Sequence, residues 1–385
     1  MPSPSISAPA AASTDTIRAM GLYVDQLSAA IRRWTSPETA ADSSFDADAD
    51  FERLARDLFA LQYEANPVYR AWCRSRRVSP SVLTSWKAIP GLPAVSFKEA
   101  EVTCLPSGGA TTVFQSSGTT GQIPSRHFHQ AVSLAAYEAS FVPWFKACVL
   151  PSDRELVWIP LVPARADAPR SSLAYMIEGL LQAVAPARVV RAGRVGTDGD
   201  WSLEWDRLLT ALAAAEGDGR PVLLMGTAFN VVHLLDALEA GRRRFRLPAG
   251  SLVMETGGYK GRSRVLTPQE LSSGIREWLG IDPQGIITEY GMSELSSQAY
   301  SFWPNTSGPG VLQFPPWARA LVISPESGNE VADGGTGLLR LLDLANVASV
   351  LCLQTEDLAI RRGSDFQLLG RRPEAESRGC SLMSA

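Results

Sequence analysis

Residues 115–121 form a short run of glycine and hydroxyl side chains that is suited to binding an anion. The run reads QSSGTTG and contributes Ser116, Ser117, Gly118, Thr119, Thr120 and Gly121. Glycines let the backbone approach a bulky anion closely, and hydroxyl and backbone N–H groups together bind phosphate oxygens without a formal charge. The run lacks the GK[ST] ending of a Walker A loop. Alone, such a run is more often an ordinary turn, so other motifs must decide its meaning.

A second motif, TEYGMSE at residues 288–294, follows a predicted strand over residues 285–288. Gly291 allows a tight turn. Tyr290 offers a flat ring on which a base can stack. Glu294 supplies a hard carboxylate oxygen of the kind that binds Mg²⁺. The motif therefore indicates a place where a nucleotide and a metal ion could meet.

Two shorter motifs follow near the end of the chain. Asp357 closes the triplet TED, which comes after the apolar run at residues 350–353. A carboxylate in that position can accept hydrogen bonds from the hydroxyls of a ribose. Gly370 and Arg371 come thirteen and fourteen residues later. Each of these motifs could be a surface loop by itself, and only their combination is informative.

The order and spacing of the four motifs resemble the adenylate-forming superfamily of acyl-CoA synthetases and related ligases. Three further segments are similar to the LuxE-like acyl-protein synthetases, which act in the fatty-acid reductase complex of bacterial luminescence. These segments are VSFK at residues 95–98, TGGYKG at residues 256–261 and RGCSL at residues 378–382. The similarity runs from about residue 50 to the end of the chain.

The resemblance implies ATP and Mg²⁺ as cofactors and assigns a role to each matching residue. Residues 116–121 would hold the ATP phosphates, and Gly257 and Gly258 would lie against adenine. Glu289, Tyr290 and Gly291 would bind the nucleotide, with Tyr290 stacked on the base. Asp357 would bind the ribose hydroxyls, and Arg371 would be the arginine of the hinge. The implied catalytic residues are Thr119, Glu294, which also holds the metal, and Cys380.

Three departures from the superfamily pattern matter. The phosphate loop usually has a lysine after its proline, whereas Pro124 is followed by Ser125 and Arg126, and whether Arg126 replaces that lysine stays open. The TGD motif has lost its glycine. The chain ends fourteen residues after Arg371, so we expect the usual mobile C-terminal lid domain to be absent.

Without a lid domain, the resemblance implies that a short tail completes the reaction. Cys380 would accept the acyl group as a thioester and deliver it to an acyl-CoA-reductase-like partner protein. A thiolate is the reactive form of cysteine, and Arg378 could favour it. The alternatives are that the acyl group goes to coenzyme A, a carrier protein or an amine, or that the chain is a non-catalytic subunit. His127 and His129 could touch substrate or phosphate, although a packing role is the more common one.

The elements that must position these residues alternate between strands and helices. Buried strands are predicted at residues 155–160, 187–191, 221–226, 251–255 and 285–288, and helices at residues 16–34, 51–72, 172–185, 205–215 and 228–240. Pro67 predicts a break in the second helix, and residues 40–50 are expected to be a loop. Such alternation is typical of layered α/β subdomains. Short strands at residues 319–323, 337–342 and 366–369 predict a smaller β-rich subdomain after them.

Composition and cysteine usage limit the remaining possibilities. The net charge of −4 argues against a nucleic-acid-binding protein, and no apolar run is long enough to span a membrane. The five cysteines form no CxxC pair, so we expect reduced thiols and a cytoplasmic protein. We expect a disordered leader over residues 1–16, an adenylate-forming domain over residues 17–370, and a hinge with the acyl-carrying tail over residues 371–385.

Overall fold

The computed structural model describes residues 14–36, 38, 46–116, 123–150, 155–197, 199–257, 266–301 and 310–372. The helices are α1 (Thr14–Trp34), α3 (Ala47–Ala65), α4 (Pro67–Ser75), α5 (Ser96–Glu99), α6 (Ala131–Val149), α7 (Ser172–Val184), α8 (Trp205–Asp218), α9 (Ala228–Ala240) and α10 (Pro268–Leu279), with 3-10 turns η1 (Trp86–Ala88) and η2 (Pro283–Gly285). No helix in this part of the chain is long and apolar enough to cross a lipid bilayer.

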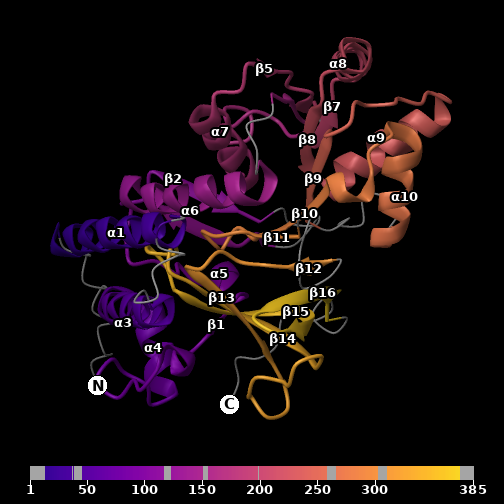
Figure 1. The fold of residues 1–385 in the computed structure, drawn as a ribbon. Coiled ribbons are helices and arrows are strands. Elements are labelled where there is room, and N and C mark those ends of the chain that lie inside the picture. Colours follow the sequence, from indigo (N-terminus) through magenta and orange to yellow (C-terminus); the bar gives the residue numbers. More distant parts are fainter. Residues whose placement is uncertain are drawn as a thin grey trace.

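A mainly parallel sheet forms the upper half of the molecule in Figure 1. Its order is β11 (Ala299–Ser301), β10 (Ile286–Tyr290), β9 (Leu252–Thr256), β8 (Val222–Thr227), β4 (Val157–Pro160) and β5 (Arg188–Val189). All neighbours run parallel except β11, which is antiparallel to β10. Parallel strands need a crossover connection between them, which explains the helices that alternate with them along the chain.

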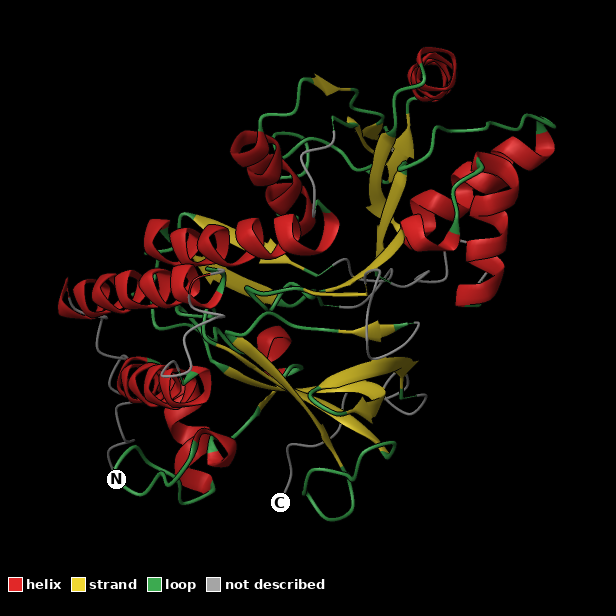
Figure 2. Ribbon diagram, viewed as in Figure 1, coloured by secondary structure: helices red, strands yellow, loops and turns green. Residues whose placement is uncertain are grey.

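Helices cover both faces of this parallel sheet. Apolar residues of α8, α9 and α10 pack with Val157, Val222 and Val253 on one face. Residues of α6 and α7 pack with Trp158 and Leu223 on the other. Figure 2 shows these helices, in red, on the two sides of the yellow strands. This arrangement confirms the layered α/β fold that the sequence predicts.

A second, mostly antiparallel sheet forms the lower half of the molecule (Figure 1). Its order is β12 (Val311–Leu312), β16 (Asp365–Arg371), β15 (Cys352–Arg362), β14 (Thr336–Asp343) and β13 (Ala318–Ile323), and β1 (Leu92–Pro93) pairs with β15. It shares its core with α1, α3 and α4. Two hairpins complete the fold, β2 (Thr112–Gln115) with β3 (Arg126–His129) and β6 (Gly193–Val195) with β7 (Trp201–Leu203).

Several sequence-based boundaries need correction. Helix α1 begins at Thr14, inside the predicted leader, and Asp15 in its first turn suits the helix dipole. The predicted loop at residues 40–50 ends at Asp46, which caps α3 by accepting hydrogen bonds from the backbone of Asp48 and Ala49. Strand β5 is exposed rather than buried because it lies at the edge of its sheet. The break before Pro67 is confirmed, since α3 ends at Ala65 and α4 starts at Pro67.

The third and fourth motifs also differ from the expectation. Asp357 lies within β15, an eleven-residue strand, rather than just beyond a strand end. Gly370 and Arg371 are the last two residues of β16. The pairing of β15 with β16 shifts register between Leu358 and Ala359, and Gly370 has a φ of 111° at this irregularity. A glycine adopts this backbone conformation without the strain that a side chain would add.

Candidate active site

The predicted anion-binding run begins at the last residue of β2 and belongs to the segment that connects β2 with β3. Gln115 and Arg126 form the last pair of the two strands. Beyond them, the Ser116 N–H donates to the Ser125 carbonyl at 3.3 Å, and the Ser125 N–H donates to the Ser116 hydroxyl at 3.0 Å. These bonds hold Ser116, near the start of the run, against Ser125, four residues beyond its end. Ser117, Gly118, Thr119, Thr120 and Gly121 lie outside the described residues.

The second motif ends at the carboxyl edge of the parallel sheet. Strands β9 and β10 pair in register, with Thr288 opposite Glu255 and Glu289 opposite Thr256. Gly257 follows β9 with a φ of 74°, and Gly258 lies beyond the described residues. The carboxyl ends of parallel strands are where open α/β sheets bind ligands. The predicted nucleotide residues therefore gather at the edge of the sheet where such a ligand is expected.

Glu255 and Glu289 are two buried carboxyl groups on these adjacent strands. Burial raises the pKa of Glu255 to about 7, against the effect of the Thr288 hydroxyl. Burial also raises the pKa of Glu289 to about 7; the Thr256 hydroxyl, which donates to this carboxyl, opposes the rise, and Glu255 adds to it. A Cβ atom at Gly291 would collide with the Glu289 carboxyl. Glycine at this position therefore keeps the turn after β10 compatible with the buried acid.

Tyr290, Asp357 and Arg371 join the two sheets. The Tyr290 hydroxyl donates to Asp357 Oδ2 at 2.7 Å. Arg371 Nε lies 3.5 Å from Asp357 Oδ1, and the two residues are partners across β15 and β16. The Tyr290 ring is only 8% exposed and has Phe366 and Phe314 edge-on to it. The tyrosine fixes the orientation of the aspartate, and its stacking on a base stays a prediction.

Glu294 lies in a buried position next to these residues. It is 6% exposed, and burial raises its pKa; the Ser125 hydroxyl and the charges of Arg371 and Lys98 oppose that rise. The charge of Arg371 acts on Glu294 from the Asp357 cluster, and the hydrogen bond between His127 of β3 and the Ser293 carbonyl holds the loop of Glu294 against the hairpin. The described members of all four motifs therefore surround one region of the molecule.

A buried polar network holds Glu294 in place. The Asn346 side-chain amide donates to the Glu294 carbonyl at 2.9 Å. His127 Nδ1 donates to the Ser293 carbonyl at 2.8 Å, and His127 Nε2 lies 2.9 Å from the Ser349 hydroxyl. Ser349 in turn lies 3.0 Å from Asn346 Oδ1. The hairpin is thus tied to the loop of Glu294 through the segment that precedes β15.

The two histidines belong to this network rather than to a surface. Burial lowers the pKa of His127 to about 4. Burial, followed by the charge of His127, holds the pKa of His129 well below its usual value. His129 Nε2 lies 3.1 Å from His127 Nδ1. Both rings are neutral at physiological pH, so their role in the structure is to connect and pack.

Sequence reasoning missed Asn346 and Ser349. The signal that could have found them is the polar interruption of an apolar stretch at residues 343–351, DLANVASVL. Polar side chains in such a stretch must find partners when they are buried. Asn346 and Ser349 find partners in each other and in His127, and the amides of Gln62 and Asn66 donate to the backbone carbonyls of Asn346 and Ser349 at 2.8 and 3.1 Å.

Glu294 is also the residue that fits a Mg²⁺ ion. Among the residues that the structure describes, no group of three His, Cys, Asp or Glu side chains could hold a metal by itself. Magnesium in nucleotide sites is commonly held by one or two carboxylates together with substrate phosphates. A single buried carboxylate near the hairpin that carries the predicted phosphate loop matches that donor set, and the metal role of Glu294 stays a prediction.

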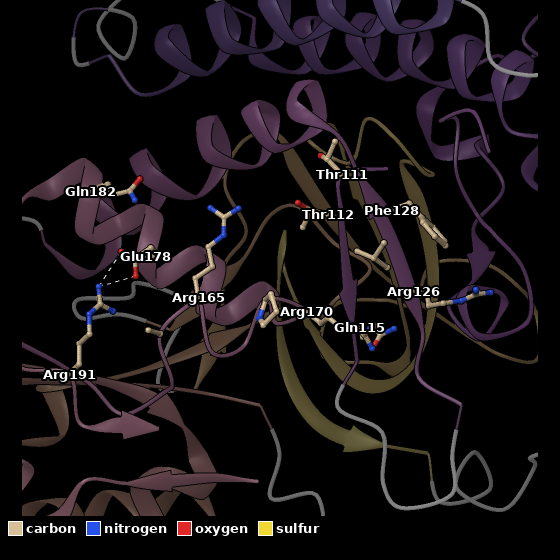
Figure 3. Close-up of a pocket in the computed structure, with 14 residues that line it drawn as sticks. Thr111, Thr112, Gln115, Arg126, Phe128, Arg165, Arg170, Glu178, Gln182 and Arg191 are labelled. Atoms are coloured by element: carbon tan, nitrogen blue, oxygen red, sulfur yellow. Dashed lines mark hydrogen bonds and ion pairs between the residues drawn. The ribbon is translucent and has the colours of Figure 1, made fainter. Parts of the chain in front are cut away.

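A cleft of about 950 Å³ opens beside the hairpin. Figure 3 shows the hairpin on one side of it and the segment before α7 on the other, with Arg170 next to Gln115. Arg126, Arg165, Arg170 and Arg191 contribute cationic groups to its lining. Arg191 forms an ion pair of 2.9 Å with Glu178.

The fold is shared with adenylate-forming ligases of solved structure. Two solved structures of 2-hydroxyisobutyryl-CoA ligase superpose on this chain with TM-scores of 0.62 and 0.60, at 15% and 13% identity. The first match covers 88% of this chain and 70% of the ligase chain. The second match covers 84% of this chain and 69% of the ligase chain. The α/β fold with its β-rich second sheet is therefore the fold of the N-terminal part of these enzymes.

Sequence comparisons place the chain in one family among those that share this fold. The family described as "Acyl-protein synthetase, LuxE" matches residues 43–385. Long-chain-fatty-acid–luciferin-component ligases of Aliivibrio fischeri and Vibrio harveyi are each 21% identical over 345 residues; the matches cover 87% and 86% of both chains, respectively. The chain belongs to the LuxE acyl-protein synthetase family. It is accordingly an enzyme of the acid–thiol ligase type that activates and ligates an acyl group.

Proposed function

We propose that this enzyme activates a long-chain fatty acid with ATP and then forms a thioester on its own Cys380. In the first step, a carboxylate oxygen of the acid attacks the α-phosphorus of ATP. The bond from that phosphorus to the bridging oxygen breaks, and pyrophosphate leaves. The products are an acyl-adenylate and pyrophosphate. The observation that carries this proposal is the convergence of the hairpin, Glu294 and the Tyr290–Asp357–Arg371 cluster on one region.

Different residues have different roles in forming the acyl-adenylate. The hairpin presents the phosphate loop from two fixed ends, Ser116 and Ser125. Asp357, held by Tyr290 and Arg371, accepts hydrogen bonds from the ribose hydroxyls. Glu294 would hold Mg²⁺ together with phosphate oxygens, and the ion would supply positive charge against the negative charge that develops when two anions approach. The name of the two bacterial relatives favours a long-chain fatty acid as the substrate.

The second step needs a thiol, and four of the five cysteines are unsuitable. Cys73, Cys104, Cys148 and Cys352 are all buried. Burial raises the pKa of Cys73 and of Cys352 to about 12 and raises those of Cys104 and Cys148 still further. A buried thiol with a raised pKa is a poor nucleophile. This exclusion supports Cys380, the remaining cysteine, as the acyl acceptor.

The length of chain before Cys380 is compatible with such a transfer. Cys380 is the eighth residue after Arg372, which is next to the Asp357 cluster, and eight extended residues span roughly 26–29 Å. The Cys380 thiolate attacks the acyl carbon, the bond from that carbon to the phosphate oxygen breaks, and AMP leaves. An acyl-CoA-reductase-like protein then receives the acyl group from the thioester.

Intact-protein mass spectrometry tests both steps together. The protein is incubated with ATP, Mg²⁺ and a panel of fatty acids of different length. We expect a mass gain of one acyl group that hydroxylamine removes, and no such gain in Cys380→Ser. The Cys380→Ser variant should keep acid-dependent exchange between ATP and labelled pyrophosphate. Full turnover of this variant with coenzyme A, a carrier protein or an amine would instead identify a free acceptor and reject the thioester on Cys380.

A further inference from the structure

The cleft beside the hairpin contains cationic groups without acidic partners. Arg165 and Arg170 line it, and neither forms an ion pair with a carboxylate in the part of the chain that the structure describes. Arg126 lies on the opposite wall, and its nearest carboxylate, Glu101, is 3.9 Å away and exposed. Arg191 forms the shorter ion pair of the cleft, 2.9 Å from Glu178. The cleft therefore carries an excess of positive charge, although the whole chain has a net charge of −4.

The position of Arg165 is fixed by an aromatic ring. Its guanidinium carbon lies 4.2 Å from the centre of the Tyr175 ring, and the Tyr175 hydroxyl donates to Glu138 Oε1 at 2.6 Å. A guanidinium stacked on an aromatic face keeps its N–H donors free in the plane of the group. Arg165 is thus oriented, and its hydrogen-bonding edge remains available to an anion.

Arg170 is attached to the strand that leads into the phosphate loop. The Gln115 N–H donates to the Arg170 carbonyl at 2.9 Å, and Arg170 Nη1 lies 3.4 Å from Gln115 Oε1. Gln115 also pairs with Arg126 at the base of the loop. The Arg170 guanidinium therefore lies beside Gln115 at the base of the loop, the Arg126 guanidinium lies over Phe128 on the hairpin, and Arg165 lies farther along the same cleft (Figure 3).

We propose that this arginine cleft receives pyrophosphate as it leaves the phosphate loop. The inference rests on the proposed function, which produces pyrophosphate at that loop. Arginine matches the geometry of phosphate groups by donating two parallel hydrogen bonds. The cleft has the volume of roughly thirty liquid water molecules, so the ion enters it with much of its hydration shell. Pyrophosphate therefore binds weakly to the cleft, and salt screens the interaction. Weak binding is what the release of a product needs.

The exchange reaction measures this site directly because pyrophosphate is then a substrate. Arg165→Gln and Arg170→Gln should each raise the KM for pyrophosphate about threefold, and the double variant about tenfold, as expected for exposed ion pairs. The KM values for ATP and for the fatty acid should change much less. The matched control is Arg244→Gln, which removes an exposed arginine paired with Glu277 near α10. Calorimetric titration of pyrophosphate without ATP should show the same order of affinities.

The outcomes separate this inference from the function on which it rests. Absence of acid-dependent exchange in the unmodified enzyme would reject the proposed function. Exchange with an unchanged KM for pyrophosphate in a folded double variant would overturn the cleft proposal alone. The cleft proposal also fails if the double variant keeps that KM but transfers acyl groups poorly to its reductase, since the arginines would then dock an acidic protein surface.

Discussion

Asp357 shows how one residue gains its function from its partners. It accepts a hydrogen bond from Tyr290, 67 residues earlier in the chain, and pairs with Arg371 on the neighbouring strand. These contacts leave a carboxylate that is only 14% exposed and has a fixed orientation. A hydrogen-bond acceptor held in this way loses little freedom when a ribose binds. The sequence motif supplies the acid, and its neighbours supply the direction in which it points.

Replacement of Asp357 by asparagine should weaken ATP binding. A hydrogen bond to a charged group contributes about 1.5–3 kcal/mol, so we expect the KM for ATP to rise about tenfold to hundredfold. Tyr290→Phe is the matched control, because it removes the donor to the same carboxylate and keeps the charge. The control should raise the KM by much less. An unchanged KM in folded Asp357→Asn would contradict the ribose role.

At the scale of elements, the adjacent strands β9 and β10 carry two buried acids at neighbouring levels of the sheet: Glu255 lies opposite Thr288, and Glu289 lies opposite Thr256. Glu255 and Glu289 both have pKa values raised to about 7 by burial. Between their usual pKa of 4.5 and about 7, the folded protein keeps protons that the unfolded chain has lost. Stability from these groups is therefore fully present below pH 4.5 and is lost as pH rises through 7.

Glu289→Gln should remove part of this pH dependence. The glutamine can still accept a hydrogen bond from Thr256, and it does not ionise. From pH 4.5 to 8 we expect the free energy of unfolding of the variant to rise relative to the wild type, by about 3 kcal/mol in all. The two histidines also make stability depend on pH, because their lowered pKa values reduce stability as pH falls. Both proteins contain these histidines, so the difference in free energy of unfolding between variant and wild type reports on Glu289 alone. Parallel melting-temperature profiles of both proteins would refute the assignment.

Other helices and strands show which features sequence patterns predict well. The break before Pro67 and the helices α7, α8 and α9 agree with the structure to within a few residues, because their apolar periodicity and cap residues are local signals. The exposure of β5 was not predictable, since a short apolar strand reads the same at the centre and at the edge of a sheet. The position of Asp357 inside β15 was missed because its alternating polar residues look like the end of a strand.

At the scale of the whole molecule, a polar network connects the two sheets through the site. His127 on the hairpin, Ser349 before β15, and Asn346 beside Glu294 form a continuous buried chain. A buried network of this kind is costly to leave incomplete, because each unpaired group keeps its desolvation cost. The network therefore couples the integrity of the fold to the position of the proposed metal ligand.

Asn346→Ala tests this coupling. It leaves the carbonyls of Glu294 and Val350 without the amide donor that each has now. We expect a loss of about 2–4 kcal/mol in the free energy of unfolding, measured by urea denaturation, together with a lower rate of pyrophosphate exchange. Asn329→Ala, in an exposed turn, is the control and should change neither quantity. Equal stabilities of the two variants would show that the network contributes nothing.

The sequence by itself determined the residue types of the site, the helices and strands that carry them, and the family to which the chain belongs. These depend on local spacing and on motifs, which a linear chain displays directly. Only the tertiary structure decided which of those residues meet. In the tertiary structure, Tyr290 contacts Asp357, and four cysteine thiols and two histidines are buried. Arg165 and Arg170 line a cleft. The physical reason is that burial and charge pairing depend on contacts between residues far apart in sequence, whereas periodicity reports only on near neighbours.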